Sequence, residues 1–115
     1  MSAHDIVLCS ALRSPIGRFQ GTLSSVRPDD LLANLFTAVI ENAGLDASHI
    51  DEVFAGCANQ AGEDNRNIAR MSTLLAGIPQ HVPAVTVNRL CASGLEAVVQ
   101  AYRSAKCGEG RLFLA

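Results

Sequence analysis

The sequence has no tryptophan, one tyrosine and a single lysine, and only 17% of its 115 residues are charged. Its formal net charge is −2, and no run of basic residues offers a surface for nucleic acid or an anionic membrane. No apolar run approaches the roughly 20 residues that cross a bilayer. Residues 1–10 lack the basic start and apolar core of a signal peptide. We therefore expect a cytoplasmic protein that binds neither nucleic acid nor a membrane.

The patterns of metal and disulfide sites are also missing. The four cysteines form no Cys-x-x-Cys pair, and no histidine stands at metal-ligand spacing. We therefore expect free thiols and no metal. Cys9 should be a small buried side chain within an apolar strand, and core packing is also the favoured role of Cys57. Cys107 falls in the last turn of a helix, the end that disfavours a thiolate.

What the sequence does have is a hydrophobic content of 49%, enough for the core of one globular unit. Apolar runs alternate with helical patterns along the chain. We predict strands at 6–12, 51–58, 82–87 and 111–115, and helices at 28–43, about 65–76 and 91–106. This β-α-β-α-β-α-β order indicates an α/β fold, a mostly parallel sheet with helices on both faces. No Gly-x-Gly-x-x-Gly follows the first strand, which disfavours a nucleotide-binding module.

Cys91 stands where the third predicted strand gives way to the third predicted helix. Ligands of parallel sheets gather at the carboxyl ends of the strands. The first turn of a helix also offers unpaired N–H groups that favour a thiolate and can hold an oxyanion. Cys91 is therefore the candidate nucleophile. Gly94 costs about 1 kcal/mol relative to alanine inside a helix, so we expect another backbone or a ligand to approach closely there.

A cysteine nucleophile usually needs a base, most often histidine. His4, His49 and His81 each precede a predicted strand, so they should lie at the amino edge of the sheet. Because a strand rises about 3.3 Å per residue, His81 should be roughly 20 Å from Cys91. No histidine of this chain is therefore expected to serve the thiol.

The acidic residues near the correct edge do not fill this role either. We interpret Glu96 as a solvated or a helix-start charge. Glu63 and Asp64 read as loop or helix-start residues, with Asn65 as a helix cap. The sequence thus predicts a nucleophile whose base comes from a partner or from a longer polypeptide.

Three segments resemble the thiolase family. Residues 87–97 read Val-Asn-Arg-Leu-Cys-Ala-Ser-Gly-Leu-Glu-Ala, similar to the thiolase nucleophile motif Asn-x-x-Cys-x-Ser-Gly. Residues 11–19 resemble the family's amino-terminal signature Arg-Thr-Pro-x-Gly, with Ser14 in the place of threonine. Residues 56–71 are similar to the β-ketoadipyl-CoA branch of the family.

The resemblance implies a fold and roles for a few residues. Thiolases have two related halves with an inserted loop domain, so residues 1–115 would be a truncated amino-terminal domain, lacking the loop and carboxyl-terminal domains. Cys91 would accept the acyl group, its own N–H would line the oxyanion hole, and Asn88 and Ser93 would support the turn. The histidine base, second cysteine and most of the coenzyme A pocket would lie farther on.

The implied activity is acyl transfer between CoA thiols through an acyl-cysteine, in the cleaving or the condensing direction. The substrate would be a 3-oxoacyl-CoA, with 3-oxoadipyl-CoA favoured over acetoacetyl-CoA. Coenzyme A would be a co-substrate, and no cofactor would be permanently bound. A homodimer or homotetramer would form through Val82–Val87 and Asn59–Asn67, and the chain alone would be inactive. The alternatives are a ketoacyl-synthase-like condensing enzyme and a non-catalytic split module that binds a partner chain.

Overall fold

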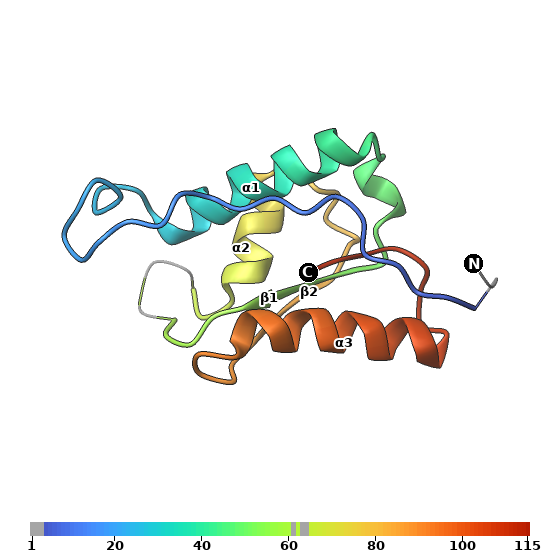
Figure 1. Cartoon of the computed structure of the whole chain (residues 1–115). Coiled ribbons are helices and arrows are strands. Elements are labelled where there is room, and N and C mark those ends of the chain that lie inside the picture. The colour runs from blue at the N-terminus through green and yellow to red at the C-terminus, as the bar shows by residue number, and fades with distance from the viewer. Residues whose placement is uncertain (1–3, 61, 63–64) are drawn as a thin grey trace.

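The computed structural model describes residues 4–60, 62 and 65–115. Its elements are α1 (Pro28–Ala43), the 3-10 turn η1 (Ala47–His49), β1 (Glu52–Gly56), α2 (Ile68–Leu75), β2 (Ala84–Val87), α3 (Ser93–Cys107) and β3 (Phe113–Leu114). The strands form one parallel sheet in the order β2-β1-β3. Helix α3 lies on one side of the sheet, and α2 and α1 lie on the other (Figure 1). The predicted α/β class with a parallel sheet and helices is confirmed.

The pairing register brings the carboxyl ends of β1 and β2 together. Val53 pairs with Ala84 and Gly56 with Val87, so β1 and β2 end at the same edge. The backbone N–H of Cys57 extends this ladder by one hydrogen bond, 3.0 Å long, to the carbonyl of Val87. The chain therefore leaves the sheet at neighbouring points, after Cys57 and after Val87, as parallel strands require.

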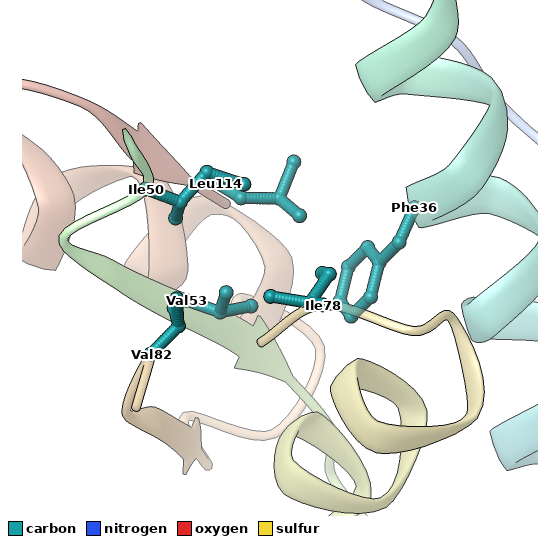
Figure 2. Packing of buried hydrophobic residues seen from close by; sticks show 6 residues of the cluster. All are labelled: Phe36, Ile50, Val53, Ile78, Val82 and Leu114. Carbon is teal, nitrogen blue, oxygen red and sulfur yellow. The ribbon is translucent and has the colours of Figure 1, made fainter. Parts of the chain in front are cut away.

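A small hydrophobic core joins α1 to the sheet (Figure 2). Its buried members come from α1, the sheet and the segments that precede β1 and β2: Phe36, Ile50, Val53, Ile78, Val82 and Leu114. Helix α1 begins with Pro28 in its first turn and ends at Gly44, which adopts a φ of 64° and donates its N–H to the carbonyl of Glu41. These start and stop signals are the ones the sequence predicts for this helix.

The prediction of a strand over 6–12 is wrong. The segment runs along α1 without pairing as a strand, and Leu8 within it is 86% exposed. Ser10 has a φ of 58°, donates its hydroxyl to the carbonyl of Val39 and accepts a hydrogen bond from Asn42. An apolar run forms a strand only where a neighbouring strand offers backbone hydrogen bonds. Here the segment is held instead by the side-chain hydrogen bonds of Ser10 to α1. Cys9, predicted to be buried, is therefore exposed.

Helix α1 covers 28–43 as predicted, and the remaining predicted elements exist but are shorter. The structure places the strand predicted at 51–58 at Glu52–Gly56, and the strand predicted at 82–87 at Ala84–Val87. Helix α2 begins after Asn67, whose side chain accepts the N–H of Arg70, so the cap is Asn67 and not Asn65. Among the described helices, none has the length and apolarity needed to cross a membrane.

Candidate functional site

Cys91 lies in a tight turn between β2 and α3, at the edge where the strands end. The turn is closed by two backbone hydrogen bonds, from Ala92 N–H to the Arg89 carbonyl at 3.0 Å and from Ser93 N–H to the Leu90 carbonyl at 3.1 Å. Leu90 adopts a left-handed φ of 48°, which is unusual for a leucine. The turn leaves the Cys91 side chain exposed, one residue before the cap of α3.

Two polar side chains anchor this turn. The amide oxygen of Asn88 accepts the N–H of Leu90 at 2.9 Å, and its nitrogen donates to the carbonyl of Ala58 at 3.2 Å. Asn88 thereby ties the segment after β2 to the segment after β1. The buried hydroxyl of Ser93 accepts the N–H of Arg89 at 2.8 Å and donates to the carbonyl of Leu90 at 2.6 Å. Both residues support the turn, as expected.

Glycine permits the close approach between β1 and the start of α3, but the glycine that matters is Gly56. A Cβ atom at Gly56 would collide with the Ser93 carbonyl group and the backbone nitrogen of Gly94. A Cβ atom at Gly94 would meet nothing within 4 Å in the described structure. The prediction that Gly94 makes room for a close approach is therefore wrong, and the glycine without room for a side chain is Gly56. The place of Gly56 inside the strand predicted over 51–58 was the available signal.

Glu96 is not the solvated charge that the sequence suggested. Its side chain is only 10% exposed, and its carboxylate lies 2.9 Å from Arg89 Nε and 3.5 Å from an Arg103 nitrogen. The Gln100 amide donates a further hydrogen bond of 2.8 Å. This bond, aided by Arg89 and Arg103, holds the pKa of the Glu96 carboxyl below its usual value, although burial acts in the opposite direction. The sequence did not predict the contact with Arg89. Arg89 lies in the turn before α3, so helical spacing does not relate it to Glu96.

The histidines lie away from Cys91, as predicted. His49 ends the turn η1 before β1, and His81 precedes β2 with its Nε2 at 3.4 Å from the Ser48 carbonyl. The carbonyl of His4 accepts a hydrogen bond from Lys106, in the last turn of α3. At about 1.5 Å per residue, the 15 residues of α3 separate that end from Cys91 by about 20 Å.

Cys57 follows β1 at the same edge of the sheet as Cys91, whereas Cys107 lies elsewhere. Cys57 is half-buried and, together with Asn88, lines an open depression of about 740 Å³. Cys107 is exposed at the far end of α3. Glu63 and Asp64 lie outside the described residues. Within the described part of the chain, no group of three His, Cys, Asp or Glu side chains could hold a metal ion.

The sequence that forms this turn is similar to known proteins. Residues 6–115 match the model of the family "Thiolase, N-terminal domain". The chain belongs to the thiolase family. It is 58% identical over 114 residues to the β-ketoadipyl-CoA thiolase of Pseudomonas aeruginosa, covering 98% of this chain and 28% of that relative. The 3-oxoadipyl-CoA/3-oxo-5,6-dehydrosuberyl-CoA thiolase of Escherichia coli is 58% identical over 113 residues, with 97% and 28% covered.

A solved structure shares the fold. The acetyl-CoA acetyltransferase of Bacillus anthracis superposes with a TM-score of 0.82 at 32% identity, over 87% of this chain and 25% of that one. The chain thus spans only 28% of the length of the Pseudomonas and Escherichia relatives. The residues from Asn88 to Gly94 therefore form a thiolase-family segment held in a defined, solvent-accessible turn.

Proposed function

We propose that this chain is the amino-terminal part of a thiolase, in which Cys91 carries the acyl group during transfer between CoA thiols. The observation that carries the proposal is the exposed Cys91 thiol in a turn anchored by Asn88 and Ser93 at the start of α3. A thiolate at this place benefits from the unpaired N–H groups of the first helical turn. Membership of the thiolase family supports acyl transfer over other cysteine chemistry.

In the cleaving direction, the Cys91 sulfur attacks the C3 carbonyl of a 3-oxoacyl-CoA. The C2–C3 bond then breaks, its electron pair stays on C2, and protonation there yields acetyl-CoA. The shortened acyl group remains on Cys91 as a thioester until the thiol of a second CoA attacks it and regenerates the free cysteine. The backbone N–H of Cys91 donates to the oxyanion of each tetrahedral intermediate.

The proton transfers need an acid–base group near the thiol. His4, His49 and His81 lie at the far end of α3 or at the amino edge of the sheet, too distant to serve. We therefore assign the base to the part of the relatives' length that this chain does not span. On this assignment, the 115-residue chain alone has no thiolase activity, and coenzyme A acts as a co-substrate.

We assign 3-oxoadipyl-CoA as the substrate. The support is the 58% identity to relatives named β-ketoadipyl-CoA thiolase and 3-oxoadipyl-CoA/3-oxo-5,6-dehydrosuberyl-CoA thiolase. Acetoacetyl-CoA is the competing substrate. A higher kcat/KM of the full-length enzyme for 3-oxoadipyl-CoA is expected, and equal or better use of acetoacetyl-CoA would contradict the assignment.

We also propose that the full-length enzyme is a homodimer or homotetramer that associates through Val82–Val87 and Asn59–Asn67. β2 supports the proposal because it lies at one edge of the described sheet, in the order β2-β1-β3. Ala61, Glu63 and Asp64 of the second segment lie outside the described residues.

Replacing Cys91 by alanine in the full-length enzyme tests the central proposal. We expect CoA-dependent cleavage to fall at least about a thousandfold, because no acyl-enzyme can form. Intact mass after mixing with substrate should show an acyl adduct on the wild-type protein and none on Cys91→Ala. The matched control is Cys107→Ala, which removes an exposed thiol at the other end of α3 and should leave turnover unchanged. Turnover retained by Cys91→Ala would overturn the proposal.

A further inference from the structure

Arg89 belongs to the turn of Cys91 in two ways. Its backbone N–H donates to the Ser93 hydroxyl, and its carbonyl accepts the N–H of Ala92. Both backbone polar groups of Arg89 are therefore bonded within the turn that contains Cys91. A displacement of the Arg89 side chain therefore moves the backbone of the turn that carries Cys91.

Glu96 holds that side chain from within the helix. Its backbone N–H donates to the carbonyl of Ala92, which places it one turn into α3. Its carboxylate accepts from Arg89 Nε at 2.9 Å on one oxygen and from Gln100 at 2.8 Å on the other. Since Glu96 is buried and Arg89 is largely exposed, the carboxylate is the fixed partner of this pair.

From these contacts we infer that Glu96 is a positioning residue for the proposed acyl transfer, acting through Arg89 to fix the turn that presents Cys91. The inference rests on the proposed function, because it assigns the geometry a catalytic consequence. Neither side chain needs to touch the substrate. A loosened turn misplaces the sulfur and the N–H of Cys91 together, and such small displacements have large effects on rate.

Substitutions in the full-length enzyme test the inference, with acetoacetyl-CoA or 3-oxoadipyl-CoA and coenzyme A as substrates. Glu96→Gln keeps the shape of the side chain and removes its charge. We expect kcat to fall about tenfold with KM changed less than about twofold, because binding is preserved while the thiol is misplaced. Arg89→Gln should lower kcat by the same factor. The double variant should have about the same kcat as either single variant, because both substitutions break the same contact.

Three further variants separate positioning from general stability. Arg89→Lys retains a cation and should recover kcat to within about threefold of the wild type. Arg103→Gln removes the more distant arginine, and Glu41→Gln removes an exposed carboxylate of α1. Both should leave kcat within about twofold of the wild type. A merely structural role would predict neither the rescue nor the split between kcat and KM.

The outcomes are distinguishable from failure of the proposed function. The acyl adduct on Cys91 should still form in Glu96→Gln, only more slowly, whereas its absence from the wild type would overturn the proposed function itself. If Glu96→Gln fails to fold, Arg89→Gln still decides, since its side chain is 64% exposed and its loss leaves the core intact. Unchanged kcat in Arg89→Gln, or single effects that multiply in the double variant, would overturn the inference.

Discussion

At the scale of single residues, the turn that holds Cys91 depends on a close backbone contact with β1. Gly56 ends β1 directly against the peptide between Ser93 and Gly94, where α3 begins. Together with the Asn88 bond to Ala58, this contact sets the distance between the segment after β1 and the turn of Cys91. The absent side chain of Gly56 is therefore a structural requirement of the site.

The two glycines at this junction predict opposite effects of alanine. Gly56→Ala should destabilise the chain by about 1–3 kcal/mol, because the new methyl group overpacks backbone atoms that cannot rotate away. Gly94→Ala should be neutral or stabilising by up to about 1 kcal/mol, because its Cβ meets open space and alanine favours a helix. Urea unfolding monitored by circular dichroism measures both. Equal effects of the two substitutions would contradict this account.

Reasoning from the sequence was most successful for residues whose role follows from local position. Cys91 follows a strand and precedes a helix, and the structure places it at the edge where the strands end. Asn88 and Ser93 support the turn by short-range hydrogen bonds. The surroundings of Glu96 could not be predicted in this way, because Arg89 reaches it only after the turn reverses the chain. The steric role of Gly56 likewise depends on a segment that lies far along the sequence.

At the scale of elements, one carboxylate joins the segments that lead into β1 and β3. An oxygen of Asp51, just before β1, accepts the N–H groups of Arg111 at 2.6 Å and Leu112 at 3.0 Å, just before β3. These bonds, the Arg111 bond most of all, hold the pKa of the Asp51 carboxyl below its ordinary value of 3.8. Since β3 has only two residues, its attachment depends on this cap as well as on pairing with β1.

The cap makes the stability of the chain depend on pH. A lowered pKa in the folded state means that Asp51 stabilises the fold above its unfolded pKa and loses this contribution as the pH falls through its folded pKa. Asp51→Asn should therefore unfold at lower urea than the wild type at about pH 7, and the gap should narrow below about pH 4. Glu41→Gln, on α1, controls for the change in net charge. A gap that stays constant down to about pH 2 would contradict the role of the carboxylate.

Elements with strong boundary signals were predicted best. Pro28 and Gly44 bound α1 as expected, and Gly108 ends α3 with a φ of 78°. The apolar segment 6–12 was predicted as a strand because hydrophobicity alone does not reveal whether a strand edge is available. In the structure the segment runs alongside α1, and the Ser10 hydroxyl donates a hydrogen bond to the carbonyl of Val39 in that helix. Strand formation is thus a property of the assembled sheet, which local sequence describes poorly.

At the scale of the whole molecule, large apolar side chains remain exposed in the described structure. Phe19 is 92% exposed, Ile16 89%, Leu90 71% and Leu95 69%. The first two lie in the loop before α1, and the other two flank Cys91 on its turn and on α3. Exposed apolar groups of this size mark surfaces that associate with other protein. We therefore expect the full-length polypeptide to bury the surface around Cys91 more deeply.

The free edge of β2 is the surface on which association can be tested. In a parallel ladder alternate residues face the neighbouring strand, and Pro83 and Val87 accept the bonds from β1. The backbone groups of Ala84 and Thr86 therefore point away from β1. Asn67 already donates to the Ala84 carbonyl at 3.3 Å, so the N–H groups of this edge are its main means of pairing with a second copy.

Ala84→Pro removes one outward N–H and leaves the ladder to β1 intact, because that ladder uses the residues on either side. We expect the full-length enzyme to shift from an oligomer toward monomers, as measured by light scattering coupled to size-exclusion chromatography over a range of concentrations. Ala84→Gly keeps the N–H and should remain oligomeric, which separates the lost hydrogen bond from the lost methyl group. Circular dichroism should show that both variants retain their fold. An oligomer unchanged by Ala84→Pro would contradict pairing through β2, since a strand that lacks this donor cannot form the same ladder with its copy.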